Sequence, residues 1–268
     1  MPVRDLANAE RSILTPPSLL SRRIFSLRLA FLHRNIGGTG VAQVSCSMST
    51  SIKKVTPLEL TSAQQDSEKL LLERLERATN EGEYFRWLLF VVGFYRGLQK
   101  FEPAKNLLEQ YLEGGGHPQQ MAHCYLALGQ IATDEGEFEA ALTYFVSALE
   151  LKPEKKKVAY VLHNNAGYCL NMLGRYAEGE QYCRLAIEVN WTRASGYRNL
   201  GVSLQGQGDL IGAAWALVEA VKSDMSDDRA RALLERLLAE HPRMIVQCPW
   251  VGDGLNPTLN MTQDIPRI

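Results

Sequence analysis

The sequence contains few of the residues that mark a metal site, a disulfide framework or a membrane span. Its 268 residues include five cysteines, an odd number, with no Cys-x-x-Cys pair and no Cys/His pair at metal-ligand spacing. No uncharged stretch approaches the roughly 18 residues that a membrane helix needs. We therefore expect no metal, no membrane span and a reducing compartment in which the cysteines are small buried apolar residues. The cysteines are Cys46, Cys124, Cys169, Cys183 and Cys248.

The sequence also lacks a large net charge and any recognisable catalytic motif. The formal net charge is -1, from 29 Lys and Arg against 30 Asp and Glu, so nothing indicates the clustered basic face that nucleic-acid binding requires. There is no Gly-x-Ser-x-Gly sequence, no P-loop and no His-Glu-x-x-His sequence, and no nucleophile motif lies near the histidines of the helical part. The sequence therefore predicts a protein that is not an enzyme, has no cofactor and binds no nucleic acid.

What the sequence does contain is helical periodicity, which is clearest between Ala122 and Pro153. Apolar and small residues recur there at spacings of three and four, which favours helix over strand. Gly136 interrupts the pattern, so the stretch predicts two short amphipathic helices joined by a tight turn. Small residues such as Gly129 and Ala141 would allow the two helix backbones to approach closely, with aromatic side chains filling the space beside them.

This stretch resembles a tetratricopeptide repeat (TPR), whose consensus of about 34 residues runs Trp-x2-Leu-Gly-x2-Tyr, then Ala-x3-Phe, then Pro. With Ala122 as the first repeat position, Leu128 and Gly129 match the Leu-Gly pair directly. Further matches are Tyr125 at the Trp position, Ala141, Phe145, Ala148 and Pro153. Ala132 replaces the consensus Tyr.

The pattern recurs along the chain, and recurrence is the criterion that identifies a repeat protein. Clear copies begin at Tyr160 and Ala194, and a degenerate copy with Val92 in place of the glycine begins near Phe85. The starts at 85, 122, 160 and 194 are therefore 37, 38 and 34 residues apart, and the longer steps are attributed to insertions in turns. The resemblance implies an all-α solenoid of three clear repeats plus one degenerate repeat, with flanking helices.

Residues outside the repeats complete the predicted solenoid, which spans 62–241. The predicted segments are a linker at 48–61, a helix at 62–80 that stacks on the first repeat, a capping helix at 227–240 and a loop-rich tail at 242–268. Gly82 is expected to end the first of these helices. The tail is expected to lie on the array, and its apolar part, 244–250, to occupy a groove in this molecule or in another.

The first 47 residues do not belong to the repeats, and two interpretations of them remain open. They include an apolar stretch that carries four arginines and no acidic residue, which resembles an organellar transit peptide. The favoured interpretation is a disordered arm or an over-extended translation start, with the chain proper beginning at Met48. That interpretation predicts a cytoplasmic protein.

The resemblance also implies where a ligand would bind. Stacked repeats form an extended concave surface, and in the TPR family the first helix of each pair lines it. Ligand-contacting residues come mainly from repeat positions 2, 5, 9, 12 and 13. Carried over to this chain, the predicted peptide-binding groove contains Arg86, Arg96, His123, Leu126, Gln130, Val161, Asn164, Asn165, Tyr168, Asn171, Ser195, Arg198, Val202 and Gln205. Asparagine can bridge a peptide backbone because it both donates and accepts, and Arg86, Arg96 and Arg198 can hold a carboxylate.

Two alternative functions follow from the predicted repeat architecture. The first is a non-catalytic module that binds a peptide or helix of a partner protein in the groove, as an adaptor, assembly factor or chaperone. The alternative is a self-assembling, homo-oligomeric scaffold, in which the apolar helix at 85–98 or the tail docks into a neighbouring copy. The carboxylate clamp of TPR co-chaperones is not matched, since only Asn165 agrees among the five clamp positions. That mismatch argues against the co-chaperone subfamily.

Overall fold

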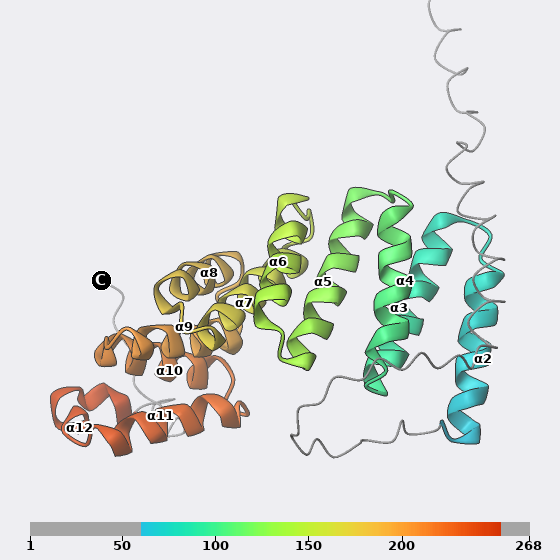
Figure 1. Cartoon of the computed structure of the whole chain (residues 1–268). Helices are drawn as coiled ribbons and strands as arrows, with labels where there is room; N and C mark the ends of the chain where they lie inside the picture. The colour runs from blue at the N-terminus through green and yellow to red at the C-terminus, as the bar shows by residue number, and fades with distance from the viewer. Residues whose placement is uncertain (1–59, 253–268) are drawn as a thin grey trace, which may run out of the picture. The chain divides into compact units, whose positions relative to one another are not determined.

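The computed structural model describes residues 60–252, and every regular element among them is a helix (Figure 1). Contacts divide the chain between Gln65 and Asp66, and the described residues from Asp66 onward belong to one unit. The predictions for residues 1–47, for most of the 48–61 linker and for the end of the tail lie outside the described residues.

Eight of the described helices form four successive hairpins. The hairpins are α3 (Glu81–Gly97) with α4 (Phe101–Glu113), α5 (Pro118–Glu135) with α6 (Phe138–Glu150), α7 (Lys156–Met172) with α8 (Tyr176–Val189), and α9 (Ala194–Gly206) with α10 (Leu210–Ser223). The flanking elements are α2 (Ser62–Glu76), α11 (Asp228–Glu240), the short α12 (Met244–Gln247) and the 3-10 helix η1 (Pro249–Val251). From α3 to α11 each helix packs on the next, which confirms the predicted all-α array of paired helices.

The turns inside the four hairpins recur at the same intervals along the chain as the predicted repeat starts. Gly136, Gly174 and Gly208 each lie two residues before the second helix and have φ values of 81°, 74° and 84°. Glycine adopts this left-handed conformation without steric cost. In the first hairpin the equivalent residue is Gln99, with φ of 56°. These four turn positions are 37, 38 and 34 residues apart, as are the predicted repeat starts, which fixes the register of the degenerate copy.

A second repeated feature is the close approach of the two helices in each hairpin. A glycine of the first helix faces a side chain of the second, and the pairs are Gly129 with Phe145, Gly167 with Cys183, and Gly201 with Leu217. A Cβ atom at these glycines would lie 2.5, 2.6 and 2.8 Å from the partner side chain, so any larger residue would force the two helices or the partner side chain to shift. Val92 and Leu108 keep the same sequence spacing in α3 and α4, and both are buried.

The prediction for the helix at 62–80 was wrong at its end, because α2 stops at Glu76 and Asn80 caps α3 instead. The Asn80 side chain accepts from the backbone N–H of Glu83 (2.9 Å), and the Glu83 carboxylate accepts from the N–H of Thr79 (2.9 Å). Side chains that satisfy free N–H groups fix the start of a helix. Gly82 consequently lies in the first turn of α3 and ends nothing.

The apolar part of the tail packs on the end of the array. Met244, Cys248 and Val251 are buried in one apolar cluster with residues of α10 and α11, including Leu217 and Leu237. These three side chains therefore extend the core of the last hairpin, so this part of the tail lies on the array, as expected, but is packed into its core and does not line the groove.

Candidate functional site

A groove of about 1090 Å³ runs across the first helices of the hairpins, α3, α5, α7 and α9, touches the start of α8 at Tyr176, and continues onto α11. Its lining residues are Arg96, Gln130, Thr133, Asn164, Asn165, Tyr168, Asn171, Met172, Tyr176, Arg198, Asn199, Val202, Arg229, Ala232, Leu233 and Arg236. Five of these side chains are amides, four are arginines and none is acidic. The groove can therefore hydrogen-bond a polypeptide backbone and attract negative charge.

Eight of the fourteen residues predicted for the groove belong to this lining. They are Arg96, Gln130, Asn164, Asn165, Tyr168, Asn171, Arg198 and Val202. The remaining six, which are Arg86, His123, Leu126, Val161, Ser195 and Gln205, are on the same first helices but outside the lining. His123 is one example, since it is half-buried beside the Phe85 ring, and burial lowers its pKa.

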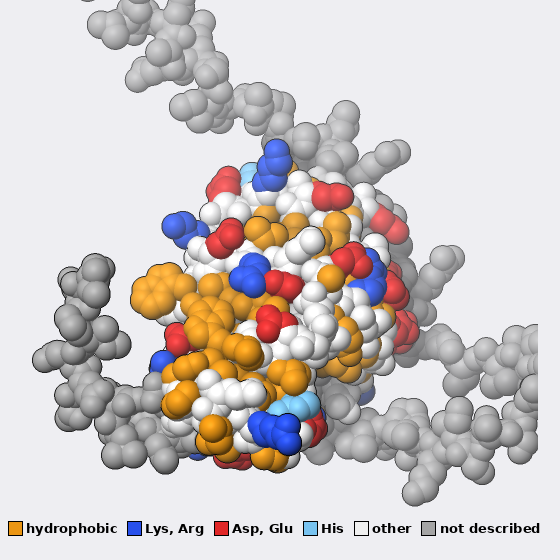
Figure 2. Space-filling model, turned by 90° about the vertical axis from the view of Figure 1, so that its left-hand side faces the viewer, with side chains coloured by type: hydrophobic (Ala, Val, Ile, Leu, Met, Phe, Trp, Pro, Cys, Tyr) orange, Lys and Arg blue, Asp and Glu red, His pale blue; other side chains and the backbone are white. Residues whose placement is uncertain are grey.

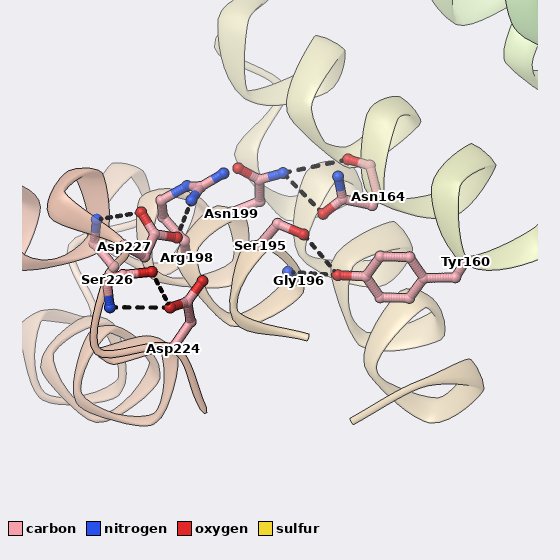
Figure 3. A network of polar contacts seen from close by, with 10 residues as sticks. Tyr160, Asn164, Ser195, Gly196, Arg198, Asn199, Asp224, Ser226 and Asp227 are labelled. Carbon is pink, nitrogen blue, oxygen red and sulfur yellow. Dashed lines mark hydrogen bonds and ion pairs between the residues drawn. The ribbon is translucent and has the colours of Figure 1, made fainter. Parts of the chain in front are cut away.

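Two of the three asparagines of α7 are hydrogen-bonded to α9, and Figure 3 shows the bonds between Asn164 and Asn199. The Asn199 amide donates to the side-chain oxygen of Asn164 (3.1 Å) and to its backbone carbonyl (3.3 Å). The Asn171 amide donates to the backbone carbonyl of Asn199 (2.9 Å). These bonds explain why a helix interior carries several asparagines, which are mildly unfavourable there. Asn164 and Asn171 thus join two hairpins, while Asn165 shares only a 3.3 Å contact with its neighbour Asn164.

Tyr160 makes a further link between the same two helices (Figure 3). Its hydroxyl lies 2.8 Å from the hydroxyl oxygen of Ser195 and accepts from the backbone N–H of Gly196 (3.0 Å). Ser195, which was predicted to contact a ligand, is therefore engaged at the junction of α7 and α9.

Two of the arginines predicted to bind a carboxylate already have acidic partners in the chain. Arg198 forms an ion pair with Asp227, whose carboxylate also accepts from the N–H of Ala230 at the start of α11 (3.1 Å). Arg96 pairs with Asp134 and donates to Gln130 (2.7 Å). These pairs place the helices relative to one another and offset much of the positive charge on the two guanidinium groups.

The contribution of α11 to the groove was missed in the sequence. Arg229, Ala232, Leu233 and Arg236 all line it, although the helix was predicted only to cap the array. The spacing of these residues, i, i+3, i+4 and i+7, is the signal of a shared helix face. No repeat position applies to them, because α11 follows the last repeat.

Two groove side chains on α7 offer apolar surface to a ligand. Tyr168 is 37% exposed and Met172 is 50% exposed. The Tyr168 ring packs edge-on against Phe138 of α6, with ring centroids 6.1 Å apart. This contact holds the ring in place while leaving part of it accessible.

The cysteines do not form a reactive site. The four described cysteines are free and buried. Burial raises the pKa of Cys124 and Cys183 to about 12 and that of Cys169 to about 11, so these thiols stay protonated at neutral pH. Among residues 60–252 no cluster of His, Cys, Asp or Glu side chains is arranged to hold a metal ion. None of the described helices is both long and apolar enough to cross a membrane.

Exposed apolar side chains also occur on α10 and α12 near the C-terminal end of the described chain, and Figure 2 shows hydrophobic side chains gathered on one face of the molecule. Ile211 and Trp215 of α10 and Ile245 and Val246 of α12 are exposed, Val246 to 83%. These four residues are called the end patch below. None of them lines the groove.

Comparison with known proteins identifies the repeat. The family model "Tetratricopeptide repeat" matches residues 122–155, beginning at the residue that the sequence pattern gives as the first repeat position. The chain is similar to an uncharacterized TPR repeat-containing protein of Arabidopsis thaliana, with 29% identity over 137 residues, or 48% of this chain and 17% of that protein. It is also similar to tetratricopeptide repeat protein 7B of Homo sapiens, with 31% identity over 111 residues, or 40% of this chain and 12% of that protein. The matches thus span less than a fifth of the length of these relatives.

Solved structures show the same fold. BtubC (BKLC) from P. vanneervenii superimposes with a TM-score of 0.59 at 16% identity, covering 78% of this chain and 96% of that one. MamA from Desulfovibrio magneticus RS-1 gives a TM-score of 0.51 at 16% identity, covering 69% of this chain and 100% of that one.

Proposed function

Because this chain is a tetratricopeptide-repeat-containing protein, we propose that it is a non-catalytic interaction module that binds a segment of a partner protein in its groove. The observation that carries the proposal is the groove itself, which is lined by the first helices of all four hairpins and by α11. Its volume of about 1090 Å³ accommodates several residues of an extended peptide. A module of this kind would serve as an adaptor, assembly factor or chaperone.

The groove residues divide into two roles in this proposal. Asn164, Asn171 and Arg198 hold the walls of the groove, since they are bonded to other parts of the chain. Tyr168 and Met172 contact the partner, because they are exposed within the groove and have apolar surface to bury. Aromatic side chains that combine a large apolar area with a polar tip commonly dominate binding energy.

Affinity capture from a lysate of the native host tests the proposal. The full-length tagged protein would be compared with a Tyr168→Ala, Met172→Ala variant. The matched control is Trp191→Ala, Met225→Ala, which also removes an exposed aromatic side chain and an exposed methionine, but outside the groove. We expect a partner that is retained by the wild type and the control and lost by the groove variant, with equal thermal unfolding of all three. Equal capture by the groove variant and the control would contradict binding in the groove.

A second candidate function, self-association, is favoured by the end patch. Its four exposed apolar residues are the kind of surface that marks an interface. Light scattering on the full-length protein at increasing concentration tests this alternative. A mass that doubles for the wild type but not for an Ile211→Asp, Val246→Asp variant would support it, and a monomer at every concentration would exclude it.

A further inference from the structure

The α11 end of the groove presents two arginines on either side of an apolar surface. Arg229 and Arg236 are separated by two helical turns, with Ala232 and Leu233 between them on the same face. Their Cα atoms are about 10 Å apart along the helix, because an α-helix rises about 1.5 Å per residue. Side chains from α9, such as Val202, line the same groove.

These two arginines differ from the other two arginines of the groove in how closely an acidic side chain pairs with each guanidinium group. Arg96 and Arg198 are paired with Asp134 and Asp227. Arg229 forms no ion pair or hydrogen bond with a side chain among residues 60–252, and Arg236 lies 3.9 Å from Glu240 in a solvent-exposed pair, which contributes little. No acidic side chain lines the groove. Its α11 end therefore presents two arginines whose positive charge no groove-lining acid among the described residues offsets.

We propose that this end of the groove binds an acidic segment of the partner, with two carboxylates that flank an apolar side chain. The inference rests on the proposed function and specifies its ligand. Each guanidinium can hold one carboxylate through two parallel hydrogen bonds, and the apolar side chain packs on Leu233. In a polyproline-II conformation a peptide rises about 3.1 Å per residue with three residues per turn, so acidic residues three positions apart lie on one face and about 9 Å apart, close to the spacing of the arginines.

The observations favour a peptide over a nucleic acid as the source of the negative charge. The net charge of the chain is -1, and two of the four groove arginines are already paired with acids. A nucleic-acid site usually shows a continuous basic stripe. The apolar surface of Leu233 between Arg229 and Arg236 suits an aliphatic side chain better than a run of phosphates.

Fluorescence anisotropy with a defined probe tests the inference. The probe is a labelled, end-blocked peptide, Gly-Ser-Glu-Thr-Leu-Glu-Ser-Gly, and its control has glutamine in place of both glutamates. The full-length protein should bind the glutamate peptide more tightly than the glutamine peptide, by about tenfold for each carboxylate removed, which corresponds to one charged hydrogen-bonded pair. Binding should weaken as the salt concentration rises, because salt screens exposed charges.

Matched variants locate the site. The Arg229→Gln, Arg236→Gln variant should lose the preference for glutamate. The control variant Arg184→Gln, Arg243→Gln changes the net charge equally but alters exposed arginines outside the groove, and should keep the preference. An equal loss in both variants would show that only overall charge matters, and would overturn the inference.

Further outcomes separate this inference from the proposed function. Equal affinity of the wild type for the glutamate and glutamine peptides would overturn the acidic-segment inference. The groove function would still stand if partner capture continued to depend on Tyr168 and Met172. Tighter binding of a uridine oligonucleotide at the same arginines would also overturn the inference, in favour of nucleic acid. Displacement of the probe by a peptide of residues 253–268 would assign the site to the chain's own tail and overturn it as well.

Discussion

Asn171 on α7 accepts a hydrogen bond of 2.7 Å from the hydroxyl of Ser203 on α9, and both side chains are buried. The Asn171 amide also donates to the backbone carbonyl of Asn199. One side chain therefore satisfies two polar groups of the next hairpin. Since a buried polar group without a partner is costly, this asparagine is expected to be important for stability.

The substitution Asn171→Ala should lower the free energy of unfolding by about 1–3 kcal/mol, because it removes the two buried hydrogen bonds that Asn171 makes between α7 and α9. Urea unfolding followed by circular dichroism measures the change. The control Asn165→Ala alters an asparagine on the same helix that has only a weak contact with its neighbour, and should change stability by less than about 0.5 kcal/mol. Equal losses in both variants would argue against the role of Asn171 as a link between hairpins.

Gln99 occupies the turn position that glycine holds in the other three hairpins. A side chain in the left-handed region costs roughly 1–2 kcal/mol, and the greater freedom of glycine in the unfolded chain offsets part of this. Gln99→Gly should therefore raise the melting temperature, with a net gain of about 0.5–1 kcal/mol. The reverse change, Gly136→Gln, should lower the melting temperature. A Gln99→Gly variant that melts below the wild type would show that the Gln99 side chain makes a compensating contact.

Stability should fall in mild acid because of two half-buried histidines. Burial lowers the pKa of His123 and of His163, and the Nδ1 atom of His163 has no hydrogen-bond partner among residues 60–252. With the folded-state pKa below the unfolded value of about 6.5, the unfolded chain binds more protons. The contribution of the two neutral histidines to the free energy of unfolding is thus fully present above about pH 6.5. It is lost as the pH falls through their folded-state pKa values.

Urea unfolding at pH 7 and at pH 5 measures this effect. The lowered pKa values of Glu83, Glu178, Glu180 and Asp224 act mainly at lower pH, because these carboxyl groups titrate mostly below the range compared. A His123→Gln, His163→Gln variant should lose less stability between the two pH values than the wild type. The same loss in both proteins would assign the acid sensitivity to other groups.

The fold was predictable because the same helical-hairpin pattern recurs four times along the sequence. The repeat phase that places starts at 85, 122, 160 and 194 reappears in the structure at the turns Gln99, Gly136, Gly174 and Gly208. Small residues at the glycine positions permit the close packing of the two helices in each hairpin. The end of α2 was predicted less well, since its apolar stripe continues to Ala78 while the capping by Asn80 depends on side-chain bonds.

The groove was only partly predictable. Repeat positions indicate which helices line it, but they do not show that a polar side chain is already engaged. Asn171 and Arg198 bond to residues that are 28 and 29 positions further along the chain, and no local pattern predicts such partners. Arg229 and Arg236 were missed for another reason, because α11 lies beyond the last repeat and has no template.

Site-specific photocrosslinking tests the central claim, binding of a partner in the groove, most directly. A benzophenone amino acid would replace Tyr168 in the groove or, as a control, the exposed Trp191 outside it. Both full-length proteins would be irradiated in lysate of the native host, and the crosslinked peptides identified by mass spectrometry. We expect one partner segment to be joined to position 168 and absent from position 191. The same adducts at both positions, or adducts at 191 alone, would contradict the assignment of the groove as the binding site.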